Sequence, residues 1–133
     1  MTAKPIANLG FLLAALVLAG CGTGDEVLYD VSGTATFDGK PIPKGVIFFD
    51  PDPTKGGAGG QGFANIWDGK YTTAEKGRGV RGGAYIIRLV GFDGKTGQEA
   101  PFGDFLFPEH QEAKELPKAN STLDFAINKK EKK

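Results

Sequence analysis

The segment YDVSGTATFDGK (residues 29–40) shows the pattern that decides the fold class, a two-residue alternation that ends in a turn signal. One side of the expected strand carries apolar and small residues, and the other side carries Asp, Ser and Thr. Such alternation is typical of a half-buried β-strand. Asp38 and Gly39 both tolerate positive φ, so a tight hairpin turn is expected directly after the strand. The residues on the inward side are Tyr29, Val31, Gly33, Ala35 and Phe37.

Further segments along the chain also have strand character, and turn signals separate them. The continuous apolar run Val46–Phe49 predicts a strand covered on both faces. The branched and aromatic run 85–90 is the strongest strand signal. The tetrapeptide aromatic-Asp-Gly-Lys recurs at residues 37, 67 and 92, which predicts the same turn three times. The spacing favours an all-β antiparallel sandwich; its remaining strands are predicted at 63–67, 71–73 and 123–127.

Three segments lack a clear strand pattern. Residues 51–62 are rich in Pro and Gly and predict a mobile loop. Residues 93–120 form a longer excursion, in which Glu109–Leu116 contains good helix formers between two prolines and predicts one or two helical turns. The Lys-rich tail 129–133 is expected to be disordered and basic.

The first twenty residues predict a processing signal and not part of the fold. Lys4 precedes an apolar run from Leu9 to Gly20, which is shorter than the about 20 residues that a membrane-spanning helix needs. The expected organisation is a signal peptide at 1–20, a flexible tether at 21–28 and a β-sandwich domain at 29–128.

The tetrapeptide Leu18-Ala19-Gly20-Cys21 resembles the lipobox of bacterial lipoproteins at all four positions. The resemblance implies recognition of Leu18, Ala19 and Gly20 by a lipoprotein signal peptidase, cleavage before Cys21, and a diacylglycerol on the Cys21 sulfur with further acylation of the new amine. It also implies a chain anchored to a bacterial membrane and exposed outside the cytoplasm, in the cell envelope. Cys21 is the only cysteine, so an intrachain disulfide and a Cys-based zinc site are excluded.

A second resemblance covers about residues 30–92. Residues 31–48 (VSGTATFDGKPIPKGVIF), with the later Asp-Gly-Lys-Tyr and Gly-Ala-Tyr strands, resemble carboxypeptidase regulatory-like domains, which have a transthyretin-like fold. This resemblance implies a seven-stranded Greek-key sandwich. In carboxypeptidases the domain is an accessory beside the catalytic one and carries no catalytic residues.

Composition argues against catalysis and against nucleic-acid binding. The chain has 16 basic and 16 acidic residues, one histidine and two serines. Zero net charge offers no general attraction for nucleic acid. His110 is expected to be a solvated polar residue, and we expect no catalytic residue. A cryptic hydrolase using His110 with Glu109 or Glu112 is kept as an alternative.

No cofactor is expected apart from the lipid on Cys21. Asp50 and Asp52 are the weak candidates for a metal ligand set, because hard cations prefer oxygen ligands. An EF-hand loop beginning at Asp50 would need Gly at Lys55 and Glu at Gln61, so only an irregular site remains as an alternative.

Aromatic residues give the remaining candidates for a binding surface. Trp67 is expected in the core, as aromatics on alternating strand positions usually are. The segment 101–108 contains Phe102, Phe105 and Phe107 between prolines and glycines. We expect it to cover an open edge or end of the sandwich, with an exposed apolar contact site as the alternative.

The sequence therefore predicts a lipid-anchored, non-catalytic binding or structural module. We expect a monomeric domain whose contact surfaces are the loops 51–62 and 93–117. The partners implied are the membrane, through the anchor, and an envelope protein or polysaccharide. A metal-binding surface module and the cryptic hydrolase are the alternatives.

Overall fold

The computed structural model describes residues 26–129, and within them the all-β prediction is confirmed. The predictions for residues 1–25, including the lipobox and Cys21, and for residues 130–133 lie outside the described residues. No helix within the described range is long and apolar enough to cross a membrane. The elements are β1 (Val31–Phe37), β2 (Lys40–Pro41), β3 (Lys44–Pro51), the 3-10 turn η1 (Pro53–Lys55), β4 (Gly62–Trp67), β5 (Lys70–Thr72), β6 (Gly83–Phe92), β7 (His110–Leu116), β8 (Ser121–Thr122) and β9 (Phe125–Ile127).

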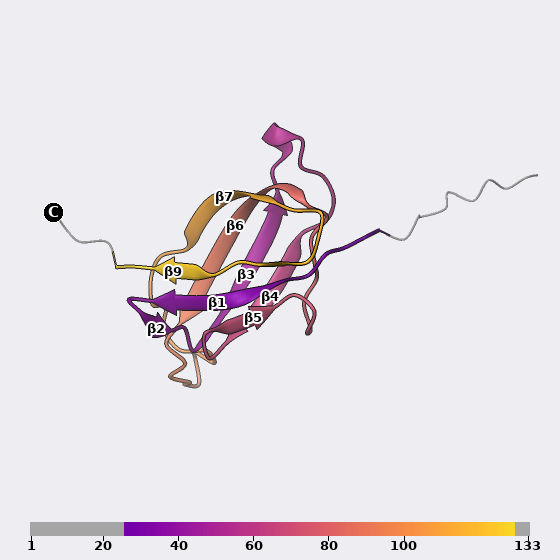
Figure 1. Cartoon of the computed structure of the whole chain (residues 1–133). Coiled ribbons are helices and arrows are strands. Elements are labelled where there is room, and N and C mark those ends of the chain that lie inside the picture. Colours follow the sequence, from indigo (N-terminus) through magenta and orange to yellow (C-terminus); the bar gives the residue numbers. More distant parts are fainter. Residues whose placement is uncertain (1–25, 130–133) are drawn as a thin grey trace, which may run out of the picture.

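The strands form one curled sheet in the order β2-β1-β5-β4-β3-β6-β7, and all neighbours in this order are antiparallel. The short strands β8 and β9 pair with the other edge of β1 in parallel. This parallel pairing differs from the wholly antiparallel arrangement predicted. It arises because residues 117–120 bring the chain from β7 to the start of β1, with Ser121 opposite Val31. Figure 1 shows β1 and β9 running across β3, β4 and β6.

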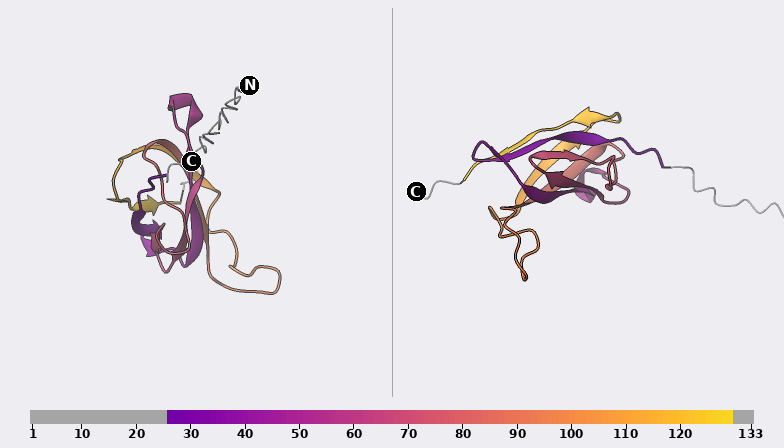
Figure 2. Two further views of the ribbon diagram at one scale, coloured as in Figure 1. Left: turned by 90° about the vertical axis from the view of Figure 1, so that its right-hand side faces the viewer. Right: turned by 90° about the horizontal axis from the view of Figure 1, so that it is seen from below.

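The hydrophobic core lies between β1 and β9 on one side and β3, β4 and β6 on the other. Figure 2 shows β1 and β9 along one side of the domain. The alternation predicted for β1 is confirmed, since Val31 and Ala35 are completely buried. Burying these apolar side chains supplies the main driving force for folding. The other completely buried side chains of this core are Ile42, Ile47, Phe49, Ala64, Ile87 and Leu89.

The prediction that Val46–Phe49 is covered on both faces is wrong. Ile47 and Phe49 are completely buried, whereas Val46 and Phe48 are only partly buried. Successive side chains of a strand point to opposite faces, and only the inner face of β3 meets β1 and β9. The outer face of the sheet is therefore incompletely covered.

The prediction of helical turns in Glu109–Leu116 is also wrong, because His110–Leu116 forms β7. All seven residues pair antiparallel with β6, from Leu89 opposite His110 to Gly83 opposite Leu116. Helix propensities differ by less than about 1 kcal/mol per residue, so a long unpaired edge on β6 outweighs them. Leu116 is buried at the end of the strand.

Two of the three predicted Asp-Gly turns are confirmed as hairpins. Asp38 and Gly39 have φ of 50° and 78°, and Asp68 and Gly69 have φ of 47° and 75°. Positive φ at both central residues is the signature of the type I′ turn. These turns join β1 to β2 and β4 to β5.

The third Asp-Gly pair does not join two adjacent strands but begins a projecting segment, residues 93–109, which we call the arm. The Asp93 carboxylate accepts hydrogen bonds from the backbone N–H groups of Lys95 and Asp104, at 2.9 and 3.2 Å. These bonds hold the two ends of the arm together. Figure 2 shows the arm, in orange, projecting from the side of the sheet opposite β1 and β9.

Candidate functional site

Asp50 forms an ion pair with Arg88 within the sheet. Its carboxylate accepts hydrogen bonds from Arg88 Nε and Gln61 Nε2, both at 2.6 Å. The Arg88 guanidinium also lies 3.5 Å from Glu109 and stacks over the Phe48 ring at 4.7 Å. Burial alone would raise the pKa of Asp50, but the hydrogen bonds from Arg88 and Gln61 outweigh it and lower the pKa.

Asp52 caps the 3-10 turn η1. It is 6% exposed, and its Oδ1 accepts hydrogen bonds from both the backbone N–H and the hydroxyl of Thr54. These hydrogen bonds, above all that from the hydroxyl, lower the pKa of Asp52. Both aspartates thus have protein partners. Among residues 26–129, no three His, Cys, Asp or Glu side chains come together as a metal-binding group.

The lowered pKa of Asp50 predicts acid sensitivity. Because the folded pKa lies below the unfolded value of about 3.9, the contribution of the pair is complete above about pH 5. It is lost as the pH falls through the folded pKa. We therefore expect Asp50→Asn to flatten the loss of stability between pH 5 and pH 2, measured as the urea midpoint. Gln61→Ala should flatten it less, because Arg88 remains, and equal slopes for Asp50→Asn and wild type would contradict the assignment.

His110 lies at the start of the edge strand β7 and is partly buried. Its Nε2 is 3.4 Å from the Glu112 carboxylate, two residues along the same strand. The His110–Glu112 pair lines neither of the hollows described next. Glu109, the other candidate for a pairing with His110, lies instead beside Arg88.

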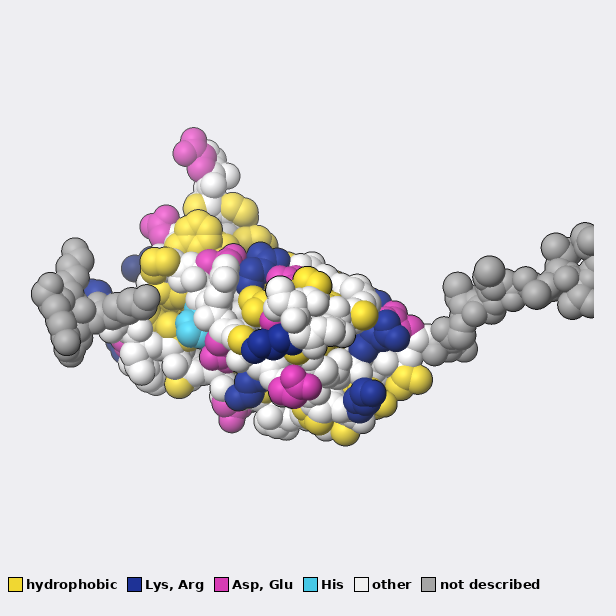
Figure 3. Space-filling model, turned by 90° about the horizontal axis from the view of Figure 1, so that it is seen from above, with side chains coloured by type: hydrophobic (Ala, Val, Ile, Leu, Met, Phe, Trp, Pro, Cys, Tyr) yellow, Lys and Arg dark blue, Asp and Glu magenta, His cyan; other side chains and the backbone are white. Residues whose placement is uncertain are grey.

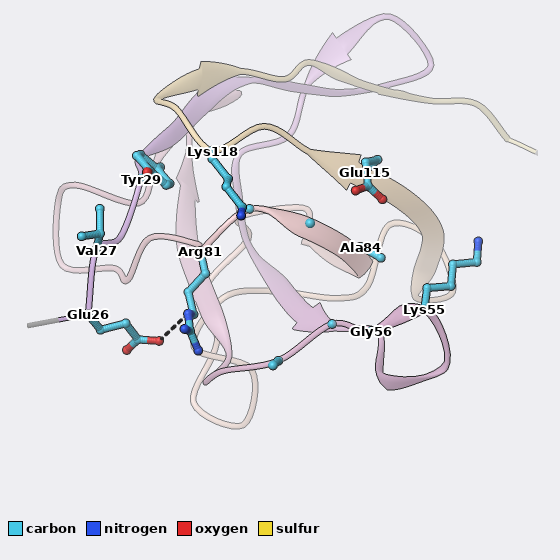
Figure 4. Close-up of a pocket in the computed structure, with 13 residues that line it drawn as sticks. Glu26, Val27, Tyr29, Lys55, Gly56, Arg81, Ala84, Glu115 and Lys118 are labelled. Carbon is cyan, nitrogen blue, oxygen red and sulfur yellow. Dashed lines mark ion pairs between the residues drawn. The ribbon is translucent and has the colours of Figure 1, made fainter. Parts of the chain in front are cut away.

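A hollow of about 900 Å³ lies where the chain enters the domain, and we call it the tether hollow. Figure 4 shows Glu26 and Arg81 meeting at one side of it. Glu26 pairs with Arg81 at 3.4 Å and with Arg78 at 2.7 Å. The floor is largely backbone at Gly56, Gly57, Gly82 and Gly83. Its charged lining side chains are Glu26, Lys55, Arg81, Glu115 and Lys118, and the pair of Glu26 with Arg81 is formed within this set.

The three phenylalanines of the arm divide between the two roles considered for them. Phe107 is 9% exposed and its ring centroid lies 5.1 Å from that of Phe37, so it closes the core as expected. Phe102 and Phe105 are 53% and 69% exposed, and both rings contact Phe92. In the view of Figure 3, hydrophobic side chains gather where the arm leaves the domain. Phe107 therefore agrees with the expected covering of the sandwich, whereas Phe102 and Phe105 form the exposed apolar surface given as the alternative.

The prediction that Trp67 lies in the core is wrong, since 64% of its surface is exposed. Ala64 and Ile66 face inward on β4, so alternation turns Asn65 and Trp67 outward. Lys44, opposite Trp67 in the β3–β4 register, places its ammonium 5.2 Å from the Trp67 ring centroid and 5.9 Å from that of Phe102. Such distances are those of cation–π contacts.

These side chains line a hollow of about 570 Å³ on the outer face of the sheet, which we call the aromatic groove. Its walls come from three strands and from the arm. Val46 contributes apolar surface to it. Its aromatic and polar lining residues are Lys44, Asn65, Trp67, Lys76, Phe92 and Phe102. The groove thus combines exposed aromatic rings with hydrogen-bond donors, the usual composition of a ligand site.

A second hollow of about 610 Å³, which we call the neighbouring hollow, lies beside the aromatic groove. Asn65, Trp67 and Lys76 line both hollows. The sequence analysis singled out none of Lys44, Asn65 and Lys76. One signal was available in the sequence. Asn65 and Trp67 are two residues apart, so they lie on the same face of the strand, and the polar Asn65 indicates that this face is the outer one.

Comparison of this chain with protein-family models, with curated proteins and with solved structures finds no match.

Proposed function

We propose that this chain is a lipid-anchored cell-envelope protein that presents a non-catalytic β-sandwich binding module. The lipobox-like Leu18-Ala19-Gly20-Cys21 supports the anchor. The curled all-β sheet supports a transthyretin-like sandwich of the carboxypeptidase regulatory-like kind. Seven of the nine described strands are longer than two residues, which supports the strand count that the resemblance implies.

The observation that carries the binding role is the gathering of three exposed aromatic side chains in one region. Trp67, Phe102 and Phe105 are 64%, 53% and 69% exposed. Leaving large aromatic rings in water is unfavourable in a monomeric domain, so a cluster of them marks a contact site. Aromatic side chains are also enriched among the residues that dominate binding energies.

The placement of these rings relative to the tether fits the same role. Strand β3 runs from Lys44, at the aromatic groove, to Pro51, next to the 3-10 turn beside the tether hollow. At about 3.3 Å per residue, its eight residues span roughly 23 Å. Cys21 precedes Glu26 by five residues, which reach at most about 18 Å. An anchor at Cys21 therefore holds Glu26 within about 18 Å of the membrane, and the aromatic groove lies at the opposite end of β3.

Charge pairing supports binding in preference to catalysis. Arg88 forms ion pairs with Asp50 and Glu109, and Arg78 and Arg81 form ion pairs with Glu26. Of the described residues that line the aromatic groove, the charged ones are Lys44 and Lys76. Stacking and hydrogen bonding are the interactions that these groups supply.

Photo-cross-linking in the native envelope tests the proposal. We expect p-benzoylphenylalanine at Phe105, which inserts into C–H bonds of any class of partner, to form an adduct in cells. The same group at Lys118, beside the tether hollow, should give much less of that adduct. An absence of adducts at both Phe105 and Phe102, in a correctly folded and membrane-bound chain, would overturn the binding role.

A further inference from the structure

Trp67 separates two hollows that together form one extended surface. The aromatic groove and the neighbouring hollow share Asn65, Trp67 and Lys76 as walls. The indole therefore lies in the middle of the combined surface and not at its margin. A ligand longer than one ring could occupy both hollows and contact Trp67 between them.

The chemistry of the lining fits a chain of sugar rings. A pyranose ring presents C–H groups on its face and hydroxyl groups around its rim. Trp67 and Phe102, which are 64% and 53% exposed, offer aromatic surface for the C–H groups. Asn65 on β4 and Thr72 on β5 offer hydrogen-bonding groups for the rim. A few polar groups among aromatic rings are the usual means of orienting a ligand.

The charge of the lining sets the class of sugar. Among the described residues that line the two hollows, three carry an ammonium group, Lys44, Lys70 and Lys76, and one, Glu75, carries a carboxylate. Three positive charges and one negative charge give a net charge of +2, on a chain whose total is zero. Complementary charge raises the rate and the selectivity of association with an anion.

The backbone at Lys76 points to the same place. Its φ is 54°, in the left-handed region that residues with a Cβ rarely adopt. Glycine would adopt this conformation without strain. Such backbone occurs in turns, as at Asp38 and Asp68, and also at binding sites, and Lys76 lines both hollows.

We propose that the combined surface binds an anionic polysaccharide, specifically a chain of hexose rings that carry carboxylate groups. The sugar faces stack on Trp67 and Phe102, and the lysines pair with the carboxylates. This inference rests on the proposed function, which makes the domain a binding module of the cell envelope. It names the class of partner that the module takes.

Affinity electrophoresis of the full chain, purified in detergent, tests this inference. Native gels contain polygalacturonate, alginate or hyaluronan, and matched gels contain neutral dextran or hydroxyethyl cellulose. We expect retardation by at least one polyuronate and by neither neutral polymer. Because Trp67 is the only tryptophan, its fluorescence reports titration with the retarding polymer directly. Binding should weaken with added salt.

Three variants and one control locate the site. Trp67→Ala should weaken binding at least about tenfold, as loss of a central aromatic anchor does. Lys70→Gln should weaken it about two- to fivefold. Lys76→Gly should weaken binding yet raise the melting temperature, because it removes both the charge and the backbone strain. Lys118→Gln, beside the tether hollow, should leave binding unchanged.

Equal retardation by neutral and acidic polymers, or retardation by none of the three polyuronates, would overturn the inference. So would unchanged affinity in Trp67→Ala with its native melting temperature. These outcomes are separable from failure of the proposed function. A cross-link from position 105 to a protein, without polyuronate binding, would leave the binding module standing and replace the class of partner.

Discussion

Phe49→Ala is expected to lower the free energy of unfolding by about 3–5 kcal/mol, the cost of removing a phenylalanine from a well-packed core. Phe49 is completely buried on the inner face of β3, in the same core cluster as Val31 of β1 and Phe125 of β9. Its backbone pairs with Gly62 of β4 and Ile87 of β6, so the sheet cannot easily collapse into the cavity. Urea denaturation, followed by circular dichroism, measures the change.

Phe105→Ala is the matched control, because it removes the same side chain from the arm. Phe105 is 69% exposed, so its removal should change the free energy of unfolding by less than about 0.5 kcal/mol. A loss at Phe105 as large as that at Phe49 would mean that the arm is part of the core. The binding role of the exposed rings would then lose its support.

Cys21→Ser is expected to release the chain from the membrane almost completely. Each buried methylene of an acyl chain contributes about 0.8 kcal/mol, and two or more chains give stable anchoring where one is marginal. A serine hydroxyl cannot replace the thiol as the acceptor of the diacylglycerol. After fractionation and a carbonate wash, wild type should remain with the membranes and Cys21→Ser should appear in the supernatant.

Thr23→Ser is the control for this variant, since it changes a neighbouring residue and leaves the cysteine in place. It should stay with the membranes. A Cys21→Ser chain that resists the carbonate wash as well as wild type does would refute the lipid anchor. The domain itself should be unaffected in both variants, so their urea midpoints should match that of wild type.

The sequence predicted strands and turns correctly where neighbouring residues decide the conformation. The alternation of residues 29–37 placed Val31 and Ala35 correctly in the core. The Asp-Gly pairs at 38 and 68 form the hairpin turns predicted, because positive φ at both residues is a local property. Phe125 and Ile127 are buried as their alternation predicts.

The errors occurred where a distant partner decides the outcome. Residues 110–116 carry helix formers, but the free edge of β6 recruits them as a strand. The Asp-Gly pair at 93 begins the arm because its carboxylate holds Asp104, eleven residues away. Composition alone cannot predict the pairing of residues 110–116 with β6 or the hydrogen bond between Asp93 and Asp104. Both depend on backbone groups that only the fold brings together.

At the candidate site, too, the sequence identified residues whose burial only tertiary packing decided. The sequence singled out Phe102, Phe105 and Phe107 as a group, and only packing separated the buried Phe107 from the two exposed rings. Trp67 was assigned to the core because aromatics usually lie there. Its exposure follows from the inward orientation of Ile66 beside it.

The sequence by itself determined the all-β class, the strands whose alternation is local, and the lipobox-like segment that predicts the anchor. The tertiary structure alone decided that β1 and β9 cover one face of the sheet and leave the other partly bare. It also brought Lys44 of β3, Trp67 of β4, the Lys76 turn and Phe102 of the arm to one groove. The physical reason is that period and turn chemistry act between near neighbours, whereas a binding surface is made by strand pairing between residues far apart in the chain.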